Sequence, residues 1–222
     1  MEDINSKYSS RRTLISTFFF SIIAGAAFSK SLELFYKLAF PVSWDWNSII
    51  KTWTPFFIFI SVLLRFYTGH LLHIKVLEQN PPSKSAYPWL YDFLFTLLEL
   101  SILYFICMCF NENKINLFFK LLLLLLCIEC FWIFTIWGLS KLLKNFIRHS
   151  IPWAWFIINL VTLICLYILI YKANLLEKFN SSLLLKISVL IIFLISAIAD
   201  MIVTDRHFIL GKKGWVFKEP ED

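Results

Sequence analysis

The chain has 222 residues, of which 59% are hydrophobic and 16% charged, and its formal net charge is +6. A soluble domain is usually about 45–50% apolar with about 25% charged residues, so this composition excludes an ordinary water-soluble protein. The apolar residues form long blocks, as membrane helices do, and the basic residues flank those blocks instead of forming a stripe for nucleic acid. We therefore expect an all-helical transmembrane bundle in contact with lipid, with no soluble domain and no nucleic-acid partner.

Six segments of the chain are apolar and long enough to cross a bilayer, which takes roughly 20 helical residues. Breaker residues separate them, including Pro41, Pro81 and the run from Asn111 to Asn113. Pro55 and Pro152 fall in predicted first turns, where a missing N–H has no cost. Together the segments form one membrane domain covering residues 1–222. The predicted spans are 13–35, 54–76, 88–110, 117–139, 151–172 and 184–205.

The first segment follows two adjacent arginines, Arg11 and Arg12. This pattern resembles a twin-arginine export signal, and residues 24–26 could serve as its cleavage site. Because five further apolar segments follow, we interpret residues 13–35 as a first membrane helix with a basic anchor.

Small residues recur every four positions in this first segment, at Ser21, Gly25 and Ser29. Such spacing lets another helix backbone approach closely. The stripe therefore either packs against another helix or faces lipid. Candidate partners of the chain are a second copy of itself and another membrane protein.

The positions of arginine indicate the orientation, since basic residues collect on the cytoplasmic side. With the N-terminus inside, four of the five arginines lie in cytoplasmic segments and the fifth, Arg65, lies within the membrane. All tryptophans except Trp132 fall at predicted interfaces, as an aromatic belt requires. We expect both termini in the cytoplasm and a location in the cell (inner) membrane.

Four of the predicted spans carry a polar residue near mid-membrane depth: Arg65, Glu99, Glu129 and Asn159. Ionisable groups at this depth usually face the protein interior or a water-filled cavity. We expect Arg65 to pair with Glu99, Glu129 or both. One cation cannot neutralise two carboxylates, so either one Glu is protonated or a cation or water completes the site.

A second polar layer is predicted toward the cytoplasmic ends of the helices. Its members are carboxylates and imidazoles, groups that bind and release protons. One interpretation is a vestibule leading to the charged layer, and the other is a set of pairs that only fix helix packing. The residues of this layer are His70, His73, Asp92, Asp200 and His207.

No cofactor or metal site is expected, and no G-x-S-x-G, H-E-x-x-H or P-loop pattern occurs. Cys127 and Cys130 form a C-x-x-C sequence, but it lies within an apolar helix without a matching second pair. His70 and His73 with one carboxylate make a weaker metal candidate.

Three functions remain open from the sequence. The first is permeation or transport of an ion or small solute through the bundle. The second is a membrane-embedded enzyme acting on lipid or redox substrates at the cytoplasmic interface. The third is a non-catalytic membrane subunit or effector.

Overall fold

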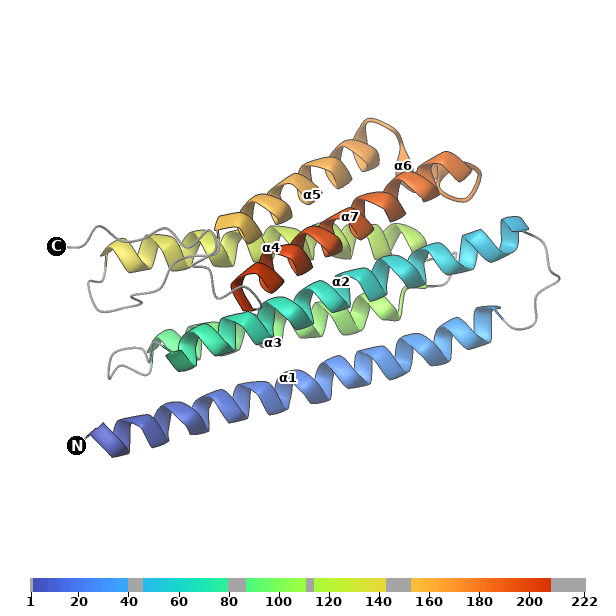
Figure 1. The fold of residues 1–222 in the computed structure, drawn as a ribbon. Coiled ribbons are helices and arrows are strands. Elements are labelled where there is room, and N and C mark those ends of the chain that lie inside the picture. The colour runs from blue at the N-terminus through green and yellow to red at the C-terminus, as the bar shows by residue number, and fades with distance from the viewer. Residues whose placement is uncertain (1, 40–45, 80–86, 111–113, 143–152, 209–222) are drawn as a thin grey trace.

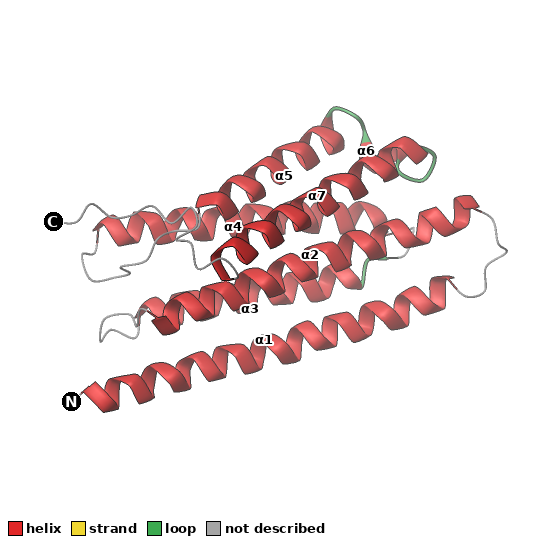
Figure 2. Cartoon of the chain, in the orientation of Figure 1, coloured by secondary structure: helices red, strands yellow, loops and turns green. Residues whose placement is uncertain are grey.

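The computed structural model describes residues 2–39, 46–79, 87–110, 114–142 and 153–208. These residues form helices joined by short turns, and no strand occurs among them (Figures 1 and 2). The predicted all-helical architecture is therefore confirmed. The helices are α1 (Glu2–Ala39), α2 (Trp46–Gln79), α3 (Tyr87–Cys107), α4 (Ile115–Leu142), α5 (Trp153–Tyr171), α6 (Leu175–Lys178) and α7 (Leu183–Phe208).

Each of the six predicted spans coincides with one long helix, but the apolar stretches differ in length. Within the described residues, four helices are long and apolar enough to cross a membrane, in the stretches Thr17–Leu38, Ile115–Leu139, Ala154–Tyr171 and Leu183–Ile202. The apolar stretch of α3, Phe93–Cys107, is shorter, and α2 is not among the four. The prediction of spanning helices is thus supported for four of six. The predicted breaks at 41–47, 81–83, 111–113 and 141–150 lie largely outside the described residues.

Helix α2 begins earlier than the sequence indicates. It starts at Trp46, so Pro55 lies inside the helix and not in its first turn. Pro55 cannot donate a backbone hydrogen bond to the preceding turn. The Thr54 hydroxyl donates to the carbonyl of Ile50 at 2.6 Å, which supplies one bond within this turn. The carbonyl that Pro55 leaves without a helical donor is that of Lys51, so this hydroxyl bond does not replace the missing one.

The six long helices form a closed ring. Each packs mainly against two neighbours, in the order α1, α2, α7, α5, α4, α3 and back to α1. Long helices that follow one another along the chain run in opposite directions, and α1 begins at the end of the bundle where α7 finishes (Figure 1). The most extensive interface joins α2 to α7, which are far apart in sequence. Phenylalanines fill the centre of the ring, including Phe59, Phe118 and Phe193.

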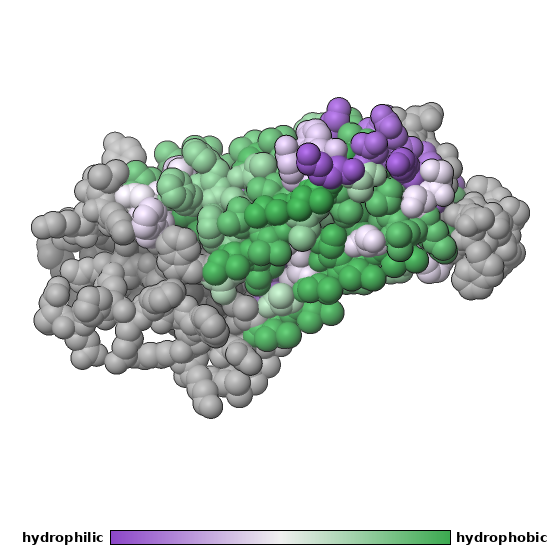
Figure 3. Space-filling model, turned by 90° about the horizontal axis from the view of Figure 1, so that it is seen from above, coloured by the Kyte–Doolittle hydropathy of each residue, from purple (hydrophilic) through white to green (hydrophobic). Residues whose placement is uncertain are grey.

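The outer surface of the bundle is apolar. Large aliphatic and aromatic side chains such as Leu94, Phe105, Phe131 and Ile195 point outward and are exposed. Figure 3 shows an apolar surface along the helices, with hydrophilic residues gathered at the end of the molecule that carries α6. An apolar exterior of this extent suits contact with lipid, whereas in water it would promote aggregation.

Candidate functional site

A hydrogen-bonded polar network crosses the interior of the ring. Arg65 on α2 donates from Nε to Oδ2 of Asp200 on α7, and from Nη2 to Oδ1 of Asn159 on α5. Asn159 in turn donates from Nδ2 to Oε2 of Glu129 on α4. The polar network, defined as Asp200, Arg65, Asn159 and Glu129, therefore links four helices.

All four members of the network are buried. Arg65 is 2% exposed, Asp200 and Glu129 are each 4% exposed, and Asn159 is completely buried. A buried charge requires an opposite charge and satisfied hydrogen bonds, since desolvation costs several kcal/mol per ion. The ion pair of Arg65 with Asp200 supplies the opposite charge. The amide of Asn159 accepts on one side and donates on the other, so it couples Glu129 to the guanidinium.

A pair of hydroxyl groups lies one helical turn away from this network. Thr162 on α5 and Ser196 on α7 approach within 2.6 Å, and both are buried. Each hydroxyl also lies within hydrogen-bonding distance of the carbonyl four residues earlier in its own helix. The α5–α7 interface is therefore polar at two successive turns, at Asn159 and Thr162 on α5.

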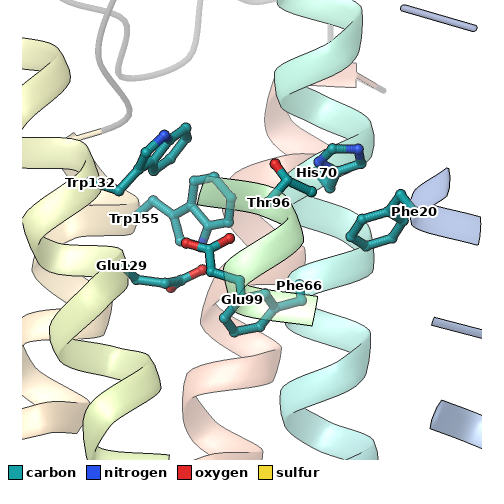
Figure 4. Close-up of a pocket in the computed structure, with 8 residues that line it drawn as sticks. All are labelled: Phe20, Phe66, His70, Thr96, Glu99, Glu129, Trp132 and Trp155. Carbon is teal, nitrogen blue, oxygen red and sulfur yellow. The ribbon is translucent and has the colours of Figure 1, made fainter. Parts of the chain in front are cut away.

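A small pocket adjoins the network through Glu129. The carboxylates of Glu99 on α3 and Glu129 on α4 point toward one another across it (Figure 4). Its free volume of about 20 Å³ holds one or two water molecules, given that one water needs about 10–15 Å³ on this measure. The residues that line the pocket are Phe20, Phe66, His70, Thr96, Glu99, Glu129, Trp132 and Trp155.

Aromatic rings surround the polar groups of the pocket. The imidazole of His70 stacks on the ring of Phe20 with centroids 4.0 Å apart and an interplanar angle of 11°. Trp132 and Trp155 meet edge to face, with centroids 6.2 Å apart. The pocket thus combines two carboxylates and an imidazole with a low-polarity wall, an environment in which electrostatic interactions are stronger than in water.

The structure regroups the residues that the sequence singled out. The direct carboxylate partner of Arg65 is Asp200, whereas the sequence indicated Glu99 or Glu129. Asp200 had been assigned to the cytoplasmic layer. It joins the network because the guanidinium of Arg65, on the long arginine side chain, reaches its carboxylate.

The remaining candidates divide into two groups. Glu99 and His70 line the pocket, on the side of the network nearest the end of α2. The side chains of His73, Asp92 and His207 lie outside the described residues. Sequence reasoning did not single out Ser196, Trp155 or Thr96. Their signal was weak, since serine, threonine and tryptophan are common in membrane helices.

Within the part of the chain that the structure describes, no group of three or more His, Cys, Asp or Glu side chains is arranged so that it could hold a metal ion. Of the C-x-x-C pair, Cys127 is exposed and Cys130 is half-buried. Cys107 and Cys109 are buried near the end of α3.

Comparisons with protein-family models, curated proteins and solved structures found no match. The chemistry of the site must therefore be argued from its own groups. These are an ion pair, a bridging amide, two carboxylates facing a water-sized pocket and an imidazole at its edge. Such groups bind, orient and exchange protons and small cations.

Proposed function

We propose that this chain is a six-span membrane protein that moves ions or small polar solutes through the interior of its helix bundle. The observation that carries the proposal is the position of Glu129. Its carboxylate accepts from Asn159 in the polar network and also faces the pocket. Groups of this kind at membrane depth commonly mark ion and proton routes.

The size and charge of the site favour the smallest cations as cargo. The free volume of about 20 Å³ has room for water or a proton carried on water, and not for an organic solute. Glu99 and Glu129 would attract a cation, and the imidazole of His70 lines the same pocket. The fixed guanidinium of Arg65, held by Asp200 and Asn159, would oppose free passage of metal ions.

A second candidate is a non-catalytic membrane subunit in which the network only specifies helix packing. The pairing of Arg65 with Asp200 favours it, because this pair joins the two helices with the largest shared interface. Buried polar groups can fix the arrangement of helices without transporting anything.

The proposal includes an orientation. Both termini would lie in the cytoplasm, and the protein would reside in the cell membrane, as the arginine distribution favours. The pocket then lies on the cytoplasmic side of the network, because it is nearer the end of the bundle where α1 begins.

The test is ion flux into liposomes that contain the purified full chain. A pH gradient between about pH 5 and pH 8 should drive proton entry that a trapped dye reports, with sodium and potassium gradients measured in parallel. Glu129→Gln should lower proton flux toward that of protein-free liposomes, since it removes the carboxylate shared by network and pocket.

The matched control is Glu33→Gln on α1. Glu33 is 43% exposed and pairs only locally, with Lys30 and Lys37, among the contacts that the structure describes, so its loss should leave flux unchanged. Absence of flux from well-folded wild-type protein at every pH and gradient would favour the subunit candidate instead.

A further inference from the structure

Trp155 reaches across the interior of the bundle from one helix to a helix that is not its neighbour in the ring. It lies in the first turn of α5, and α7 stands between α5 and α2 in the ring order. Its indole nevertheless lies directly against Gly69 of α2. A Cβ atom at Gly69 would overlap indole atoms Cε2, Cζ2 and Cη2 of Trp155.

The absence of a side chain at Gly69 therefore leaves the space that the indole occupies. Glycine in a helix interior costs roughly 0.5–1 kcal/mol relative to alanine, so a helical glycine usually serves close packing. The other two described glycines differ, since a Cβ at Gly25 or Gly138 would meet nothing within 4 Å. Only the Gly69 position is filled by an aromatic ring from another helix.

The indole of Trp155 also forms part of the wall of the pocket. It lines the same small space as Glu99 and Glu129, and Trp132 meets it edge to face with ring centroids 6.2 Å apart. The indole is therefore packed against both Gly69 and Trp132. The free volume that remains is about 20 Å³.

We propose that Trp155 sets the size of the species that reaches Glu99 and Glu129, and that its seat on Gly69 restricts this species to water, a hydrated proton or a cation of similar size. The identity of the moving species rests on the proposed function. The restriction on size does not rest on the proposed function, because it follows from the packing of the indole alone.

Removal of the indole should enlarge the pocket. A large-to-small change in a packed interior leaves a cavity that the surroundings fill only partly, and cavities of this size accept aromatic molecules from solution. Trp155→Ala should therefore admit molecules that the wild type excludes. Added indole should occupy the vacated space and restore the exclusion.

Thiol labelling measures access to the pocket without any transport. Thr96 lines the pocket, so Thr96→Cys provides a target, and peptide mass spectrometry distinguishes it from the five native cysteines. The probe is 2-aminoethyl methanethiosulfonate. We expect labelling in the Trp155→Ala background to be at least about tenfold faster than with Trp155 present, since a closed site reacts only through local opening. Indole should reverse the increase.

Gly69→Ala provides a second, smaller change that tests the same contact. The added methyl group must displace the indole, so labelling at position 96 should again accelerate. Gly138→Ala is the matched control, because its methyl group enters open space and should leave the rate unchanged. The labelling rate of each variant is compared with that of the wild-type background in preparations of equal monodispersity. If one of Trp155→Ala and Gly69→Ala does not fold, the labelling rate of the other tests the proposal.

Liposome flux then separates this inference from the proposed function. Wild-type protein should pass protons but not methylammonium, and Trp155→Ala should pass both. If labelling is faster in the variants but the wild type shows no flux, the size restriction by Trp155 is supported and the proposed function is overturned. Flux in the wild type, with labelling rates unchanged in the folded Trp155 and Gly69 variants, would overturn the role proposed for Trp155.

Discussion

Arg65 holds the polar network together because its guanidinium donates to two side chains at once. Nε donates to Asp200 and Nη2 donates to Asn159, and these two acceptors lie on different helices. A guanidinium presents its donors in a rigid plane, whereas a lysine ammonium is a single flexible point charge. Lysine at this position would retain the charge but not the fixed geometry that joins α7 and α5 through α2.

Loss of Arg65 alone should be more damaging than loss of the whole ion pair. Arg65→Met leaves the carboxylate of Asp200 buried without its cation, which costs about 3–5 kcal/mol, whereas apolar replacement of both partners can be neutral. We expect Arg65→Met to lower the yield of monodisperse protein and its thermal stability in detergent. Arg65→Met combined with Asp200→Leu should recover much of both.

Lys37→Met is the control for this cycle. Lys37 pairs with Glu33 at 2.6 Å on the exposed face of α1, and exposed pairs contribute about 0–1 kcal/mol. Its yield should match the wild type. Equal losses in the Arg65 single and double variants would show that the pair is not energetically coupled.

The sequence identified all four members of the polar network but not how they pair. An ionisable residue in an apolar segment is visible in the sequence, and this is how Arg65, Glu129 and Asp200 were found. Their pairing depends on helix order and on where each helix ends. The sequence placed Asp200 in a separate layer from Arg65, and it provides no direct measure of how far the long arginine side chain reaches along the bundle.

At the level of single helices, α1 has one face that packs and one that does not. Ala27 is 1% exposed and Ala24 is also buried, against the side formed by α2 and α3. Ser21, Gly25 and Ser29, the small-residue stripe, are all exposed. The short side chains that bring α1 close to its neighbours are therefore the alanines, and not this stripe.

Leucine substitutions on the two faces should have opposite outcomes. Ala27→Leu places extra volume in a filled interface, and overpacking typically costs about 1–3 kcal/mol. Gly25→Leu enters open space and should be tolerated or mildly stabilising, since leucine is a better helix former. Thermal unfolding of the two purified variants in detergent makes the comparison. A larger loss for Gly25→Leu would mean that a partner covers the stripe in the folded protein.

The hydroxyl pair of Thr162 and Ser196 joins α5 to α7 beside the ion pair. Hydrogen bonds between membrane helices contribute on average about 0.6 kcal/mol. A double-mutant cycle with Thr162→Val and Ser196→Ala should give a coupling energy of about that size. A coupling of zero would mean that each hydroxyl is satisfied by its own helix, to which both are also bonded.

For the molecule as a whole, the number and position of the long helices were readable from the sequence, but their arrangement was not. Apolar blocks and breakers locate helices because backbone groups in lipid must bond within the segment. Which helices become neighbours in space is not visible in any single segment of the sequence. Placing α7 between α2 and α5 depends on the match of Arg65 with Asp200 and Asn159, residues 135 and 94 positions apart from Arg65.

The proposed six-span topology predicts where each connecting segment lies. Reporter fusions after Asn47, Asn113 and Asn180 should report the outside, and fusions after Lys84, Asn145 and the C-terminus should report the cytoplasm. The reason is the cytoplasmic excess of arginine. A C-terminal reporter on the outside would require an odd number of crossings and would contradict the proposed orientation of the pocket.

The closed ring also has a consequence for how the protein is made. The helix that carries Asp200 is synthesised well after α2, because Asp200 lies 135 residues after Arg65. At a translation rate of about 5–20 residues per second, Arg65 is in place for roughly 7–27 s before its carboxylate exists. In the proposed six-span topology, the unfinished bundle therefore contains a guanidinium that lipid cannot solvate. Such an intermediate would have to be shielded by the insertion machinery or another membrane protein until α7 closes the ring.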